Sequence, residues 1–107
     1  MLDMERAEFY KAVYNIVAEI PKGKVMTYGQ IGFMLGSRYY ARRVGRALAC
    51  SSKQLGLPCH RVVNGKGEMA PPHAFGGKDK QRKMLLDEGT TFKANGCVDI
   101  KISLWRI

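Results

Sequence analysis

Three consecutive residues, Cys59, His60 and Arg61, place a thiol, an imidazole and a guanidinium next to one another in the chain. A cysteine attacks as its thiolate, which forms near neutral pH only where positive charge or hydrogen-bond donors lower a free pKa of about 8.5. His60 and Arg61 would supply that charge, so the stretch predicts a reactive cysteine. The alternative from these residues alone is a buried, inert cysteine at the start of the apolar strand Val62–Val63.

Helices must position this stretch, and the first of them precede it in the chain. Apolar residues recur at helical spacing over residues 4–20, which predicts an amphipathic helix. A turn and a short extended stretch over residues 25–26 follow. Thr27 and Gln30 then have the spacing of a capping box, which predicts that a second helix begins there and ends at Gly36.

A third helix is predicted over residues 38–49, so the chain contains a helix-turn-helix. One face of this helix carries a basic residue every fourth position, and we call these residues the arginine stripe: Arg38, Arg42 and Arg46. Like charges at this spacing destabilise a helix by about 0.2 to 0.5 kcal/mol per pair, and a row of phosphates would remove the repulsion. The small Gly45 and Ala49 would let a DNA backbone approach closely. The alternative is a solvated basic face on a core helix.

The overall charge also favours a nucleic-acid partner. The chain has 18 Lys and Arg against 9 Asp and Glu, a formal net charge of +9 over 107 residues. A polyanion would be attracted to such an excess, because each phosphate that is neutralised releases condensed counterions. A generally basic, soluble surface is the alternative explanation.

The length of the chain and its cysteine content limit which classes of protein remain possible. Residues 1–107 are expected to form a single domain. Cys50, Cys59 and Cys97 are an odd number without Cys-x-x-Cys spacing, so we expect no disulfide framework, no metal site and no cofactor. Because no window resembles a signal peptide or a membrane span, we expect a cytoplasmic protein without a membrane partner, present as a monomer.

The second half of the chain contains fewer long sequence patterns that predict helices or strands. Asn64-Gly65 predicts a tight turn, and residues 78–87 predict a helix that Gly89 ends. Apolar residues alternate over residues 98–104, which predicts a half-buried strand that pairs back onto residues 90–92 through a turn at Asn95-Gly96. The expected fold class is therefore mainly α with small β elements, a winged helix-turn-helix-like domain.

Four blocks in this order resemble the O6-alkylguanine-DNA alkyltransferases. Residues 58–62 read Pro-Cys-His-Arg-Val, the signature of that family's active-site loop. Tyr28 and Arg42 stand at the spacing that the family uses, and residues 85–89 resemble a later block that ends in Glu-Gly. Together the blocks span about residues 9–89.

The resemblance implies catalytic roles for three residues. Cys59 would accept the alkyl group, His60 would deprotonate it through a water, and Glu88 would orient and charge the imidazole, as in other nucleophilic triads. Neighbouring side chains on an extended strand point to opposite faces. Cys59 and His60 therefore need a non-extended backbone or a bridging water to act together.

The resemblance also implies base flipping, because a base must leave the duplex before a protein can act on it. Tyr28 would donate to the flipped guanine, and Arg42 would fill the gap left in the stack. The carbonyls of Cys59 and Val62 would read the guanine edge. The second helix of the motif would lie in the minor groove rather than the major groove.

Two departures from the family point toward a smaller class. Ser51 stands where the family usually has an asparagine that braces the active-site turn, and Pro71-Pro72-His73 interrupts the pocket-lining region. The departures and the short length resemble the alkyltransferase-like proteins, which bind alkylated guanine without repairing it and recruit other repair factors. Those proteins typically have tryptophan or alanine at the cysteine position, whereas this chain keeps Cys59.

Three functions therefore remain open. The one we place first is repair of duplex DNA containing O6-alkylguanine by a single transfer of the alkyl group to Cys59. The second is a lesion sensor that binds the same DNA without transfer and recruits other repair proteins. The third, a general helix-turn-helix regulator, leaves the Cys-His-Arg stretch without a role.

Overall fold

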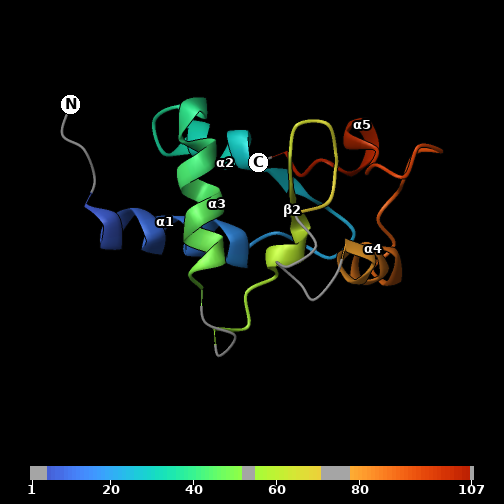
Figure 1. Cartoon of the computed structure of the whole chain (residues 1–107), viewed down its shortest axis with the longest axis horizontal. Helices are drawn as coiled ribbons and strands as arrows, with labels where there is room; N and C mark the ends of the chain where they lie inside the picture. The colour runs from blue at the N-terminus through green and yellow to red at the C-terminus, as the bar shows by residue number, and fades with distance from the viewer. Residues whose placement is uncertain (1–4, 52–54, 71–77, 107) are drawn as a thin grey trace.

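The structure is a computed structural model that describes residues 5–51, 55–70 and 78–106. Its elements are, in chain order, α1 (Arg6–Ala18), β1 (Met26–Thr27), α2 (Tyr28–Met34), the 3-10 helix η1 (Arg38–Tyr40), α3 (Ala41–Ala49), the 3-10 helix η3 (Cys59–Arg61), β2 (Val62–Val63), α4 (Lys78–Asp87) and α5 (Ile100–Ser103). Helices α1 to α3 lie toward one end of the long axis, and α4 and α5 lie toward the other (Figure 1). The expected fold class, mainly α with small β elements, is confirmed.

The helix-turn-helix forms as the sequence predicts. At the start of α2, the Gln30 amide donates to Thr27 Oγ1 at 2.9 Å, and the Thr27 amide donates to Gln30 Oε1 at 3.3 Å, which completes the capping box. A Cβ on Gly32 would lie 2.9 Å from the Ser37 carbonyl oxygen, so only glycine allows this close turn. The predicted helix over residues 38–49 is divided into η1 and α3.

Two short strands join the halves of the chain. β1 pairs with β2 in parallel, with Met26 opposite Val62 and Thr27 opposite Val63. The C-terminal tail adds a further pairing, in which the Val25 amide donates to the Ser103 carbonyl at 2.9 Å and the Trp105 amide donates to the Val25 carbonyl at 2.8 Å. The start of α2 is therefore held against both the Cys59 segment and the tail.

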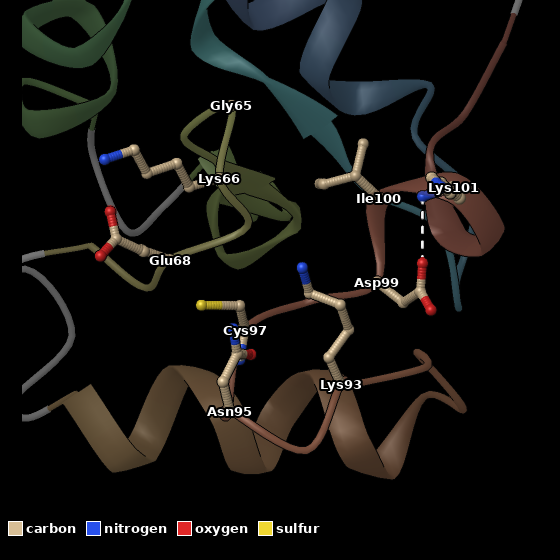
Figure 2. A pocket seen from close by; sticks show the side chains of 9 residues that line it. All are labelled: Gly65, Lys66, Glu68, Lys93, Asn95, Cys97, Asp99, Ile100 and Lys101. Carbon is tan, nitrogen blue, oxygen red and sulfur yellow. Dashed lines mark hydrogen bonds between the residues drawn. The ribbon is translucent and has the colours of Figure 1, made fainter.

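The tail corrects one prediction. The turn at Asn95-Gly96 and a bridge between Phe92 and Val98 are present, but residues 100–103 form helix α5 instead of a strand. Asp99 caps this helix, because its Oδ1 accepts from the Lys101 amide at 3.1 Å (Figure 2). Ile102 is consequently exposed. The alternation of apolar residues was too short to distinguish a strand from one helical turn.

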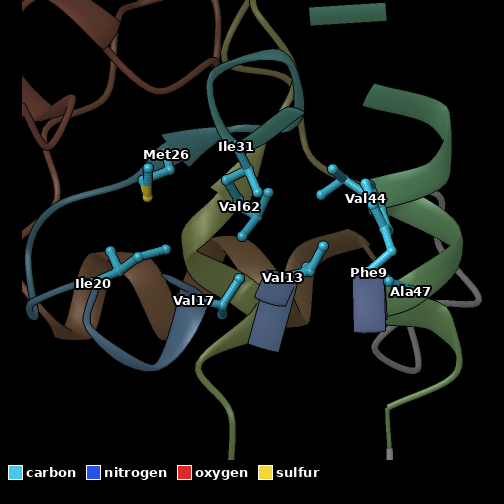
Figure 3. Packing of buried hydrophobic residues seen from close by; sticks show 9 residues of the cluster. All are labelled: Phe9, Val13, Val17, Ile20, Met26, Ile31, Val44, Ala47 and Val62. Carbon is cyan, nitrogen blue, oxygen red and sulfur yellow. The ribbon is translucent and has the colours of Figure 1, made fainter. Parts of the chain in front are cut away.

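The main core lies between α1, the helix-turn-helix and β2 (Figure 3). Its buried members are Phe9, Val13, Val17, Ile20, Met26, Ile31, Val44, Ala47 and Val62. The predicted apolar face of α1 supplies three of them, and Ile20 follows just after, because the helix covers residues 6–18 rather than 4–20. Val62 follows η3 directly, so the core anchors the Cys59 segment. No helix in the described ranges has the length and apolar composition needed to cross a membrane.

Candidate functional site

The stretch Cys59–Arg61 forms a 3-10 turn, η3, immediately before β2. The Arg61 amide donates to the Pro58 carbonyl at 2.9 Å, and the Cys59 amide donates to the Leu57 carbonyl at 2.8 Å. Side chains that follow one another in a 3-10 helix are about 120° apart. The non-extended backbone that cooperation between Cys59 and His60 requires is therefore present.

Glu88, just after α4, binds both basic residues of the turn. His60 Nε2 lies 2.9 Å from Glu88 Oε1. Arg61 donates to both carboxylate oxygens, from Nε to Oε1 at 2.9 Å and from Nη2 to Oε2 at 2.5 Å, and its Nη1 donates to the Ile20 carbonyl at 2.7 Å. These hydrogen bonds, those of Arg61 first, hold the pKa of Glu88 below its usual range. Glu88 and His60 are thus brought together as predicted, and Arg61 joins them.

The thiol of Cys59 has a different environment from the one predicted. Burial raises its pKa, and the Ser51 hydroxyl, 3.6 Å from Sγ, opposes this increase only in part. The expectation that His60 and Arg61 lower the pKa of this thiol is wrong. Both side chains bind Glu88 instead, and its negative charge offsets theirs.

Tyr28 is the first residue of α2, and its hydroxyl lies close enough to Cys59 for the thiol to affect it. Burial and the nearby Cys59 both raise the pKa of its hydroxyl. Its ring faces α3 at Gly45, where a Cβ would lie 3.9 Å from Tyr28 Cε1. Val62 is fully buried, backbone and side chain together. The three predicted pocket residues come from three elements, Tyr28 from α2, Cys59 from η3 and Val62 from β2, which the pairing of β1 with β2 holds together.

The arginine stripe is exposed along η1 and α3. Arg38 lies with its guanidinium 5.5 Å from the centre of the Tyr39 ring. Arg43, on α3, turns inward, and its guanidinium packs over the rings of Phe9 at 4.2 Å and Tyr40 at 4.8 Å. The spacing in the sequence therefore identified the exposed arginines and did not include Arg43, which packs against the core.

Sequence reasoning missed Gln81, a fully buried side chain of α4. Its amide contacts backbone groups of the segment that contains η3 and β2. The only signal in the sequence was a glutamine among basic residues, on a helix face shared with Leu85 and Glu88.

Other features give no candidate site. Pro71-Pro72-His73 lies outside the described residues. A surface hollow beside α4 and α5 contains Lys66, Lys93 and Cys97 but no predicted site residue (Figure 2). Within residues 5–51, 55–70 and 78–106, no three His, Cys, Asp or Glu side chains are grouped so that they could hold a metal ion.

Comparison with known proteins gives consistent results. The family model described as "6-O-methylguanine DNA methyltransferase, DNA binding domain" matches residues 8–90. Alkyltransferase-like protein 1 of Schizosaccharomyces pombe is 37% identical over 101 residues, which are 94% of this chain and 94% of that protein. A DNA base-flipping protein of Escherichia coli is 38% identical over 105 residues, which cover 95% of this chain and 78% of that protein.

Solved structures give the same relationship. The S. pombe protein Atl1, in complex with damaged DNA containing O6-carboxymethylguanine, matches with a TM-score of 0.82 at 34% identity, over 97% of this chain and 100% of that chain. The O6-methylguanine methyltransferase of Mycobacterium tuberculosis matches with a TM-score of 0.65 at 29% identity, over 87% of this chain and 55% of that chain. The resemblance found in the sequence is confirmed, and the chain belongs to the family of the 6-O-methylguanine DNA methyltransferase DNA-binding domain.

Proposed function

We propose that this chain binds O6-alkylguanine in duplex DNA by base flipping and acts as a lesion sensor that recruits other repair proteins. The observation that carries the proposal is its likeness, over nearly the full length of both chains, to a protein whose structure holds DNA with O6-carboxymethylguanine. This reverses the order drawn from the sequence, in which alkyl transfer comes first.

The exposed arginines and the residues around Cys59 have complementary roles in this function. Arg38 and Arg46 contact phosphates, which positions the protein on the duplex. Arg42 fills the stack where the damaged base has left. Tyr28 donates its hydroxyl hydrogen to the flipped base, next to Cys59. The hydroxyl carries that hydrogen at neutral pH, because burial raises its pKa further.

The state of the Cys59 thiol supports binding without transfer. Transfer needs the thiolate, and burial raises the pKa of this thiol. The side chains of His60 and Arg61 both bind the Glu88 carboxylate. The negative charge of Glu88 therefore offsets the positive charge that would otherwise stabilise a thiolate at Cys59. Burial thus favours the protonated thiol, which in this proposal forms part of the pocket wall.

Single-turnover transfer is the second candidate, because the chain keeps a cysteine next to a His60–Glu88 pair. In that reaction the sulfur of Cys59 forms a bond to the alkyl carbon and the bond from that carbon to guanine O6 breaks. The thiol proton passes through His60 to the departing guanine. His60→Ala or Glu88→Gln would then slow transfer by about 10² to 10⁴, the usual contribution of general-base assistance.

Intact-protein mass spectrometry after incubation with duplex DNA carrying O6-methylguanine tests the proposal. We expect an unchanged protein mass, methylated DNA at the end, and tighter binding than to plain DNA. Cys59→Ala should bind the lesion about as tightly as the natural chain. One added methyl group at Cys59 with plain guanine in the DNA would establish transfer instead. Equal binding to both DNAs without transfer would leave only a general helix-turn-helix binder.

Salt dependence tests the role of the arginine stripe. If Arg38 and Arg46 contact phosphates, log affinity should fall linearly with log salt concentration, and these two contacts should contribute about −1.8 to the slope, at about −0.9 per contact. Arg46→Ala should make the slope shallower by about 0.9. Lys101→Ala, which removes an exposed charge outside the stripe, should leave the slope unchanged. Affinity that does not vary with salt would contradict phosphate binding.

A further inference from the structure

Cys59 has one side-chain hydrogen-bond partner among the described residues, the hydroxyl of Ser51. Ser51 follows the end of α3, and its Oγ lies 3.6 Å from Cys59 Sγ. The same hydroxyl donates to the carbonyl oxygen of Leu48 at 2.8 Å. A hydroxyl group has one hydrogen and two lone pairs. Ser51 can therefore donate fully to only one of these neighbours at a time, the carbonyl or the sulfur.

The protonation state of Cys59 decides which neighbour receives the hydrogen. A thiol can donate its own hydrogen to Ser51 Oγ while the hydroxyl hydrogen stays on the Leu48 carbonyl. A thiolate can only accept, and it attracts the hydroxyl hydrogen because hydrogen bonds to charged groups are stronger than neutral ones. The Leu48 carbonyl keeps a partner when the hydroxyl turns away, since it also accepts from the Ser51 amide at 3.2 Å. Turning the hydroxyl therefore leaves no carbonyl without a donor.

Other groups near the thiol are less suited to stabilise a thiolate. Tyr14 of α1 and Tyr28 of α2 lie near enough for Cys59 to raise the pKa of both hydroxyls. Neither forms a hydrogen bond with the sulfur in the described part of the chain, and Tyr14 donates instead to the Ala47 carbonyl at 2.7 Å. The two basic residues that follow Cys59 bind the carboxylate of Glu88. The amide of Cys59 itself favours the thiolate less than the Ser51 hydroxyl does.

We propose that the Ser51 hydroxyl is a rotor, which donates to the Leu48 carbonyl while Cys59 is a thiol and turns its hydrogen to the sulfur when the thiol loses its proton to water. The rotor reduces the free-energy cost of forming the thiolate without cancelling the effect of burial. Ser51 thereby sets the pH range in which Cys59 can act as a nucleophile. The inference concerns the thiol alone, so it stands or fails independently of lesion binding.

Alkylation of the free protein by iodoacetamide tests the rotor. The thiolate sulfur forms a bond to the methylene carbon of the reagent and iodide leaves, so the rate follows the fraction of thiolate. Peptide mapping by mass spectrometry separates Cys59 from the other cysteines, and rates from neutral to alkaline pH give the midpoint of its ionisation. In Ser51→Ala we expect this midpoint to rise by about 0.5 to 1 pH unit, the effect of losing a hydrogen bond to a charged group whose donor also serves a carbonyl.

The direction of the change separates the rotor from a role in packing. Alanine is smaller than serine, so if Ser51 only fills space, Ser51→Ala admits water to the sulfur and the midpoint falls. A midpoint that falls or does not move would overturn the inference. Ser51→Thr keeps the hydroxyl and should retain the natural midpoint, whereas Ser51→Val has nearly the same shape without the hydroxyl and should behave as Ser51→Ala. This pair keeps the test decisive if Ser51→Ala does not fold.

Two controls accompany these variants. Cys97, a partly exposed thiol in the second half of the chain, should keep its midpoint in every variant. Ser37→Ala removes another partly exposed serine hydroxyl, which accepts from the Tyr39 amide at the start of η1, and it should leave the midpoint of Cys59 unchanged. Equal shifts in Ser37→Ala and Ser51→Ala would show a general change in the helix-turn-helix and would contradict the rotor.

Discussion

Arg42→Ala should weaken binding to duplex DNA carrying O6-methylguanine by about 10- to 100-fold and remove most of the preference over plain DNA. Flipping a base costs a few kcal/mol, and a side chain that fills the stack offsets part of that cost. Arg42 is exposed on α3, so its removal should leave the fold unchanged. Fluorescence anisotropy with both duplexes at one salt concentration measures the effect.

Arg46→Ala is the matched control for this prediction. Arg46 lies one helical turn further along α3, is equally charged and is also exposed. As a phosphate contact, it should contribute equally to the affinity for damaged and plain DNA. If the two variants lose the same affinity for both duplexes, Arg42 does not occupy the stack.

Local signals explain why the helix-turn-helix could be predicted from the sequence. The capping box at Thr27 and Gln30 involves residues three apart, and the periodicity of α1 and α3 reports which face is buried. The same periodicity placed Arg38, Arg42 and Arg46 on the exposed face. These signals do not depend on the rest of the fold.

Contacts between distant residues explain what the sequence did not reveal. The parallel pairing of β1 with β2 and the hydrogen bonds of Gln81 to the carbonyls of His60 and Val62 join residues that are about 20 or more positions apart. A glutamine in a basic helix has no pattern that marks it as buried. In the tail, α5 formed where alternation favoured a strand, since one Asp99 cap was enough to begin a helical turn.

The environment of Cys59 could not be inferred from its neighbours in the sequence. His60 and Arg61 are adjacent to it in the chain, yet their charged groups lie against Glu88, 27 residues or more away. These two partners lower the pKa of the Glu88 carboxyl. The pKa of the Cys59 thiol is raised, mainly because the thiol is buried. Sequence proximity predicted which groups are present at the site, and the fold determined which of them interact.

Glu88→Ala should reduce the free energy of unfolding by about 3 to 5 kcal/mol, as expected when one partner of a buried ion pair is removed. The side chains of Arg61 and Glu88 are only 12% and 15% exposed, so the guanidinium would lose both carboxylate oxygens with little water to replace them. Chemical denaturation at neutral pH measures the change. Asp79→Ala is the control, because Asp79 forms an ion pair with Arg82 but is 86% exposed, and its removal should change stability by less than about 1 kcal/mol.

The same pair should make stability depend on acidity. The pKa of Glu88 is lower in the folded chain than the ordinary value of about 4.3 in the unfolded chain, so the unfolded carboxyl binds protons first. Its contribution is therefore complete well above pH 4.3 and is lost as pH falls through the folded pKa. The difference in unfolding free energy between the natural chain and Glu88→Ala should shrink below about pH 4.3. A difference that stays constant down to pH 2 would mean that the charge on Glu88 does not stabilise the turn that carries Cys59.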